Sequence, residues 1–229
     1  MNKTSGFTLI EIAIVLLIIS FALGSLLIPL SSSLEQKSID KAIVQVDELK
    51  QATINFVTTN GNLPCPDTNN DGIEERTDNI NCDNPLGTIP FVTLGSPHGT
   101  DPWGQPFIYR VTAAFADTTN GTACGTNTTN TSISLCSNAD GDINVQGWNL
   151  SPPVGATQLA NGVPAVILST GRPLSIGPSA LEQENTDNDV LYSKTNYGGP
   201  NSSMPFNDIV EWISANQLIG VLVRTQQLP

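Results

Sequence analysis

A long apolar segment follows a short polar leader at the start of the sequence. The leader is residues 1–6, and the apolar run then continues to Leu30. No charged residue occurs from Ile12 to Leu34, a stretch of 23 residues. Because an α-helix rises about 1.5 Å per residue, such a stretch is long enough to cross the hydrocarbon core of a bilayer. The pattern therefore predicts a transmembrane segment over about residues 7–30.

Beyond this run, apolar residues recur at helical spacing, with charged residues between them. The residues of this stripe are Ile39, Ala42, Ile43, Val46, Leu49, Thr53, Phe56 and Val57. We expect one stem helix over residues 7–58, whose second half packs the stripe against a head domain at 59–229. Asn60-Gly61 predicts the end of the helix, because glycine readily adopts the left-handed conformation of a C-cap.

The head has a different composition, in which short apolar runs alternate with stretches rich in Pro, Gly, Asn, Asp and Thr. The predicted strands are Pro90–Leu94, Pro106–Thr112, Ala165–Ser169, Val190–Ser193 and Ile209–Ile213. Residues 214–217 resemble a capping box before a short helix at Leu218–Arg224. Together these elements predict an α+β fold, with a long N-terminal helix packed on a loop-rich head that holds an antiparallel β-sheet.

Charge narrows the range of partners. The chain has 21 acidic and 9 basic residues, a formal net charge of −12, and charged residues make up only 13% of it. Residues 58–229 alone hold 16 acidic and 5 basic residues. Nucleic-acid binding needs clustered Lys and Arg, so this composition argues against a nucleic-acid partner. It also argues against peripheral docking on anionic lipid.

Glu11 stands at the start of the apolar run. A carboxylate there is costly unless it is paired or lies at the membrane interface. One interpretation places Glu11 among the lipid headgroups with no further role. In the other, a cut before Phe7 creates an α-amine four residues away. The amine of a neighbouring subunit would then neutralise Glu11 inside a low-dielectric helical bundle.

The segment Gly6-Phe7-Thr8-Leu9-Ile10-Glu11 resembles the type IV prepilin cleavage and methylation motif. The resemblance implies cleavage between Gly6 and Phe7 by prepilin peptidase, N-methylation of Phe7, and use of Glu11 in subunit docking. It also implies other pilin or pseudopilin subunits and an inner-membrane assembly platform as partners, with membrane lipid as the surroundings before assembly. The expected location is the inner membrane with the head in the periplasm, and then a pilus or pseudopilus that can reach the cell surface.

A second segment, Asp101-Pro102-Trp103-Gly104-Gln105-Pro106-Phe107, is similar to part of pseudopilin heads. The expected function is therefore a structural subunit, a minor pilin or pseudopilin, of a type IV pilus-like or type II secretion filament. An adhesive or ligand-binding head at a filament tip is the alternative. A membrane-anchored hydrolase is a remote one, because His98 is the only histidine and no catalytic constellation is recognisable. We predict no catalytic residue.

Four cysteines, Cys65, Cys82, Cys124 and Cys136, allow three pairings. An even number in an exported chain favours disulfides. We expect the local pairing of Cys65 with Cys82 and of Cys124 with Cys136, which closes two short polar loops.

The first of these loops has the oxygen spacing of a calcium loop. The predicted ligands are Asp67, Asn69, Asp71, the Ile73 carbonyl, Glu75 and Asp78, with a glycine at the sixth loop position. The alternative is a solvated turn in which Asp and Asn serve only as turn formers. Weaker calcium candidates are residues 138–142 and 184–189. The family resemblance also implies calcium, because related pseudopilins use it to order head loops.

Overall fold

The computed structural model describes residue 6 and residues 8–77, 80–117, 141–149, 155–174, 177–196 and 205–225, with only the backbone described at 23–32, 114 and 149. The chain divides into two compact units, Met1–Asp40 and Lys41–Pro229, which are considered separately. The fold is α+β, as the sequence pattern predicts.

Helix α1 extends over Leu9–Asn60, 52 residues. Its observed end agrees with the predicted cap, because Gly61 has a φ of 75° and its N–H donates to the Val57 carbonyl at 2.8 Å. In the first unit, the described side chains from Leu9 to Phe21 are exposed. Within the described part of the chain, we find no helix that combines the length and the apolar character needed to cross a membrane.

The second unit is built around a four-stranded antiparallel sheet in the order β3-β4-β7-β9. Its strands are β3 (Leu86–Thr88), β4 (Ile108–Val111), β7 (Ala165–Ser169) and β9 (Ile209–Ile213). Each neighbouring pair is antiparallel. The structure thus confirms the strands predicted within Pro106–Thr112, at Ala165–Ser169 and at Ile209–Ile213.

A second sheet has the order β6-β5-β8. It consists of β5 (Ile143–Asn149), β6 (Gly155–Val163) and β8 (Leu191–Lys194). β5 pairs with β6 in the antiparallel sense and with β8 in the parallel sense, so this sheet is mixed. A separate short ladder joins β1 (Arg76–Thr77) to β2 (Asn81–Cys82).

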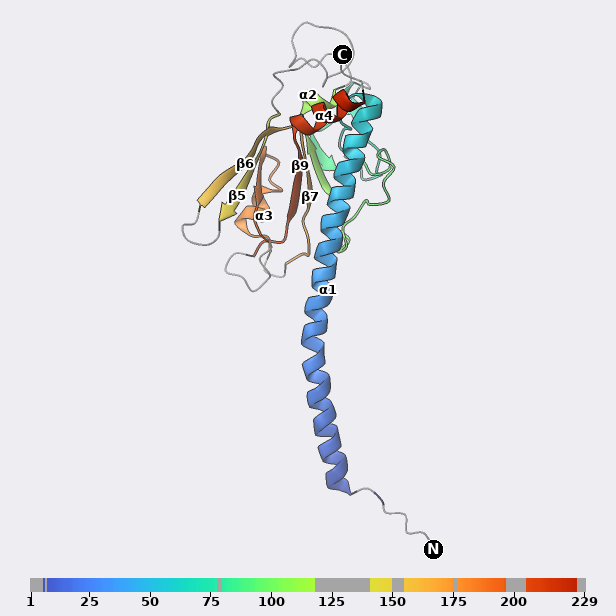
Figure 1. Cartoon of the computed structure of the whole chain (residues 1–229), viewed down its shortest axis with the longest axis vertical. Helices are drawn as coiled ribbons and strands as arrows, with labels where there is room; N and C mark the ends of the chain where they lie inside the picture. Colours follow the sequence, from blue (N-terminus) through green and yellow to red (C-terminus); the bar gives the residue numbers. More distant parts are fainter. Residues whose placement is uncertain are drawn as a thin grey trace. The chain divides into compact units, whose positions relative to one another are not determined.

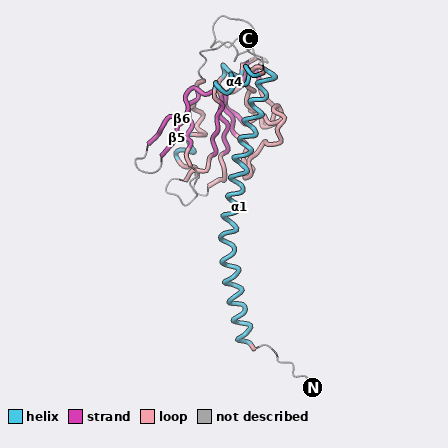
Figure 2. Tube along the Cα trace, in the orientation of Figure 1, coloured by secondary structure: helices cyan, strands magenta, loops and turns pink. Residues whose placement is uncertain are grey.

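The four-stranded sheet is covered on both faces, because alternate residues of its strands enter two different cores. In Figure 1, the upper part of α1 lies on one side of β7 and β9, and β5 and β6 lie on the other. On one face, Ile167 packs with Leu49 and other residues from the part of α1 that belongs to this unit. On the other face, Leu168 packs with Val145 of β5 and Tyr192 of β8. The layers of the second unit are therefore helix, sheet and sheet, and Figure 2 shows the strands in magenta with long loops between them.

Three short helices complete the second unit: α2 (Ala113–Ala116), α3 (Ala180–Glu184) and α4 (Ala215–Arg224). α4 begins with the capping box that the sequence predicts, in which Ser214 and Gln217 exchange hydrogen bonds. α3 begins with an equivalent box formed by Ser179 and Glu182.

The strand predicted at Pro90–Leu94 is wrong. The Leu94 N–H donates to the Pro90 carbonyl at 3.0 Å, and the Val92 N–H donates to Gly72 at 2.8 Å, so the segment folds into turns. Its apolar side chains are still partly buried, because Phe91 and Leu94 pack against the core beside α1. The apolar residues of this segment cover the core from a turn. Apolar content alone therefore does not distinguish a strand from a turn that packs on the core.

Candidate functional site

The N-terminal site is built on the first turn of α1. The Glu11 carboxylate accepts hydrogen bonds from the Thr8 N–H and hydroxyl, both at 2.9 Å, and the Glu11 N–H donates to Thr8 Oγ1 at 3.3 Å. This reciprocal pair is a capping box, which satisfies N–H groups that an isolated helix end leaves free. Thr8 has no role among the sequence predictions above, although a Thr three residues before a Glu is the signature of such a box.

Gly6 is exposed, with open space where a side chain would begin. Phe7, predicted to become the methylated N-terminal residue, lies outside the described residues. The first turns of α1 then present large apolar side chains to solvent. The exposed ones are Leu9, Ile10, Ile12, Ile14, Val15, Leu16, Leu17, Ile18, Ile19 and Phe21. A contiguous apolar surface of this kind needs lipid or protein to cover it.

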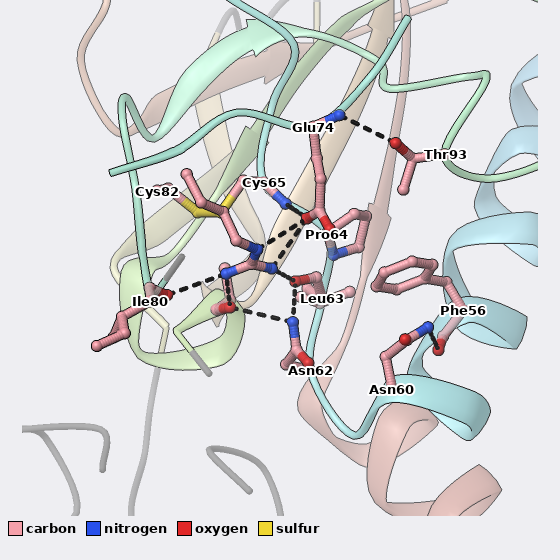
Figure 3. A network of polar contacts seen from close by, with 12 residues as sticks. Phe56, Asn60, Asn62, Leu63, Pro64, Cys65, Glu74, Ile80, Cys82 and Thr93 are labelled. Atoms are coloured by element: carbon pink, nitrogen blue, oxygen red, sulfur yellow. Dashed lines mark hydrogen bonds and ion pairs between the residues drawn. A yellow bond between two sulfur atoms is a disulfide. The ribbon is translucent and has the colours of Figure 1, made fainter. Parts of the chain in front are cut away.

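The second predicted site, the acidic loop after α1, is held by a disulfide and a partly buried ion pair. Cys65 and Cys82 form the predicted disulfide, with their Cα atoms 5.2 Å apart. Arg76 Nη2 lies 2.9 Å from a Glu74 carboxylate oxygen, and the Cys65 N–H donates to that same oxygen at 2.9 Å (Figure 3). The other two cysteines, Cys124 and Cys136, lie outside the described residues.

Arg76 also bonds to three carbonyl groups. They belong to Leu63 just after α1, Ile80 beside β2, and Ala116 at the end of α2. The guanidinium therefore links the acidic loop by hydrogen bonds to Leu63 just after α1 and to the end of α2. These bonds hold the start of the loop in place.

Three of the predicted calcium ligands come together in this loop. One carboxylate oxygen each from Asp67, Asp71 and Glu75 lies within 4.8 Å of the others. All three donors are hard anionic oxygens, the type that Ca²⁺ prefers, so these residues fit the ion. Asp78 lies outside the described residues.

Hydrogen bonds within the loop hold these carboxylates in position. Asp67, only 1% exposed, accepts three backbone N–H groups, including that of Gly72 at 2.7 Å. Glu75 accepts the Thr68 N–H at 2.6 Å and the Asn69 side-chain amide at 2.6 Å. These bonds also satisfy a turn without any ion, so the geometry is compatible with both interpretations of the loop.

Of the two weaker loops, one is only partly described. Residues 138–140 lie outside the described residues, and Asp142 exchanges hydrogen bonds with Thr112. In the other, carboxylate oxygens of Glu184, Asp187 and Asp189 lie within 4.8 Å of one another. Slight burial and the two neighbouring aspartates raise the pKa of Glu184.

His98 and Asp101, both singled out in the sequence, have structural partners. His98 lies between two α1 side chains, with Nδ1 3.2 Å from Gln45 Nε2 and Nε2 2.7 Å from a Glu48 oxygen. Asp101 is buried, and its Oδ1 accepts the N–H groups of Trp103 and Gln105, both at 2.9 Å. Asp101 thus caps the turn formed by residues 101–105.

A buried acidic pair is a feature that no sequence pattern marks. Glu182 of α3 and Asp208, just before β9, are both buried and line one cavity of about 270 Å³. Burial raises the pKa of Asp208 to about 7; a hydrogen bond from Asn185 opposes this rise, and the charge of Glu182 adds to it. The two residues are 26 positions apart in the sequence, so only the tertiary structure reveals the pair.

The comparisons with known proteins bear on the N-terminal site. Residues 1–27 match the prokaryotic N-terminal methylation motif. No curated protein and no solved structure matches the chain. The matched segment contains Gly6, Phe7 and Glu11, the residues that carry the resemblance found in the sequence. The chain therefore carries a type IV pilin-like prepilin signal at residues 1–27.

Proposed function

We propose that this protein is a structural subunit, a minor pilin or pseudopilin, of a type IV pilus-like or type II secretion filament. The prepilin signal at residues 1–27 is the observation that carries the proposal. The exposed apolar side chains of residues 9–21 support it, because a helix of this kind gains stability when lipid or other helices cover it.

In this proposal, prepilin peptidase cuts between Gly6 and Phe7 and the new N-terminus is methylated. The segment over about residues 7–30 spans the inner membrane before assembly, with the head, residues 59–229, in the periplasm. During assembly the apolar helices leave the bilayer and pack laterally on an assembly platform. Such a heterologous contact does not close on itself, so it propagates as a filament.

Glu11 is the proposed docking residue. In the isolated chain its carboxylate caps α1 through Thr8. Inside a bundle of apolar helices, an unpaired carboxylate would be strongly unfavourable. The α-amine of Phe7 in a neighbouring subunit would neutralise this carboxylate. A subunit in the wrong register would leave the carboxylate unpaired at a cost in free energy, so the pairing selects the register of assembly.

Two measurements test this function. Mass spectrometry of the mature protein should give an N-terminus at methylated Phe7; an intact Met1 or a cut after about residue 30 would contradict the proposal. Glu11→Ala should abolish incorporation into filaments and leave membrane insertion intact. Asp47→Ala is the matched control, because Asp47 is an exposed carboxylate on the same helix. Equal incorporation of both variants would exclude docking through Glu11.

We also propose that the acidic loop binds Ca²⁺ through Asp67, Asp71 and Glu75. The proximity of their carboxylate oxygens supports this. The ion would supply positive charge that offsets the mutual repulsion of three acids, and it would order the loop between the two cysteines.

A further inference from the structure

The cavity that contains Asp208 has the features of a ligand site. It measures about 270 Å³ and lies between the loop that follows β7, helix α3 and the residues that precede β9. Pro173, Leu174 and Pro178 contribute apolar wall, and Asp208 and Glu182 contribute carboxyl groups. A small pocket with mostly apolar walls and a few polar groups is the usual form of a small-ligand site.

Asp208 is the group in this pocket that is available to a ligand. It is only 8% exposed, and its Oδ2 accepts a hydrogen bond from Asn185 Nδ2 at 2.8 Å. Within the described part of the chain, its Oδ1 accepts no hydrogen bond. A buried carboxylate is stabilised far more by an ionised donor than by a neutral one. The pocket thus presents a carboxylate oxygen that still lacks a donor.

Glu182 adds negative charge without competing for the ligand. One of its oxygens accepts the Ser179 N–H at 2.6 Å, and the other accepts the Asn207 N–H at 2.9 Å. Its two oxygens are therefore occupied by the backbone, and its charge acts on Asp208 at a distance. Burial is the main cause of the raised pKa of Asp208, and the charge of Glu182 adds to it.

The pocket wall formed by the loop after β7 is closely packed. Gly171 has a φ of 63°, and a Cβ at this position would come within 2.4 Å of the Asn207 carbonyl oxygen. The loop after β7 therefore lies directly against the segment that carries Asp208. Arg172 also lines the pocket, but it is exposed and is not among the hydrogen-bond partners of Asp208.

We propose that this pocket binds a primary alkylammonium group, with the ammonium on Asp208 Oδ1 and the alkyl stem against Pro173, Leu174 and Pro178. An ammonium supplies three donors and a positive charge, which satisfies the free oxygen and offsets both carboxylates. A neutral alcohol of the same length would contact the same apolar wall without neutralising the charge. The inference does not depend on the filament role.

The same chemistry has two sources, a small free amine or the lysine side chain of a second copy of the chain. Lys37 and Lys41 on α1 are exposed, and neither forms an ion pair within the described part of the chain. A lysine stem is apolar up to its ammonium, so it matches the pocket in the same way as a free alkylamine.

The test uses the full-length protein in detergent at pH 8, with n-pentylammonium chloride as probe and 1-pentanol and sodium chloride as controls. We expect the ammonium to raise the melting temperature by several degrees and both controls to leave it unchanged. Asp208→Asn keeps an acceptor for Asn185 but removes the charge, so it should lose this rise. Asp47→Asn should retain it. An equal rise with 1-pentanol, or in Asp208→Asn, would overturn the proposal.

A second measurement keeps the test valid if Asp208→Asn folds poorly. The side-chain amide signals of Asn185 in the NMR spectrum of the unaltered protein should move with n-pentylammonium and stay in place with 1-pentanol; no movement overturns the proposal. Carbodiimide coupling of the full-length protein then separates the sources. A crosslinked peptide pair that joins Asp208 to Lys37 or Lys41 assigns the ligand to a second copy, and retained amine binding without it assigns the ligand to a free amine.

Discussion

The ammonium of Lys50 on α1 lies 3.2 Å from the carboxylate of Glu211 on β9. The two residues are 161 positions apart, so this ion pair joins the helix to the edge strand of the four-stranded sheet. The other Glu211 oxygen accepts a hydrogen bond from Lys194 of β8 at 2.7 Å. Lys194 in turn lies over the Trp212 ring, 5.1 Å from its centroid. A single carboxylate thus links all three layers of the second unit.

Glu211→Gln should lower the free energy of unfolding by about 1 kcal/mol, since both ion pairs are partly exposed. Urea titration at pH 7 measures the change, with Asp47→Asn as the control. Burial raises the pKa of Glu211, but Lys194 and Lys50 outweigh burial and lower it overall. The two ion pairs of Glu211 therefore contribute their full stabilisation at pH values above the ordinary carboxylate pKa. This stabilisation is lost as the pH falls through the lowered pKa of Glu211. An unchanged acid limb in Glu211→Gln would contradict this assignment.

Asp208 should give the protein an unusual pH dependence. Its pKa rises from 3.8 to about 7 on folding, so folding takes up a proton between these values. Stability should therefore fall as the pH rises through this window, by at most about 4 kcal/mol. Urea titrations at pH 5 and pH 8 should show this loss in the unaltered protein, and Asp208→Asn should be nearly flat. Parallel pH profiles for the two proteins would exclude the buried acid as the cause.

Calcium should stabilise the protein through the acidic loop. An ion present at about 100 times its dissociation constant adds about 2.7 kcal/mol, so millimolar calcium should raise the melting temperature relative to chelator. Asp71→Asn should abolish the rise, because it removes one of the three clustered carboxylates. The substitution should leave the loop folded, because Asp71 is exposed and accepts only one backbone N–H within the loop, that of Ile73. Asp83→Asn, an exposed acid outside the cluster, should keep it. No difference between chelator and calcium would remove the proposal.

The Cys65–Cys82 disulfide should contribute about 3 kcal/mol, the value expected for a loop with a sequence separation of 17. Cys65→Ala combined with Cys82→Ala should therefore shift the urea midpoint downward. Reducing agent should produce a larger shift in the unaltered protein than in the double variant, which keeps only the predicted Cys124–Cys136 pair. A double variant as stable as the parent would show that the Arg76 bonds alone hold the loop.

Asp101→Ala should cost about 3 kcal/mol, because it leaves buried donors unsatisfied. Three donors would lose their acceptor. They are the two N–H groups bonded to Oδ1 and the Ser169 hydroxyl, which donates to Oδ2 at 2.8 Å. Asp101→Asn retains one acceptor oxygen and should cost less. Urea titration of both variants checks this order, and equal losses would argue against hydrogen bonding as the cause.

Features that depend on local periodicity and short spacing could be predicted from the sequence. Helix α1, strands β7 and β9, the Ser214 capping box and the prepilin signal each lie within one continuous stretch, so neighbouring residues suffice to identify them. The polar edge strand β6, in contrast, carries only weak alternation, with exposed residues over most of its length. It forms because β5 offers it a pairing partner.

Contacts between residues far apart in the sequence follow only from the three-dimensional fold. The fold makes Pro90–Leu94 a turn that covers the core, with the Leu94 N–H bonded to the Pro90 carbonyl within the segment. It also placed Asp208 beside Glu182, and Glu211 between two lysines. The strength of such contacts depends on burial and on distance in space, and neither quantity is encoded in the spacing of residues along the chain.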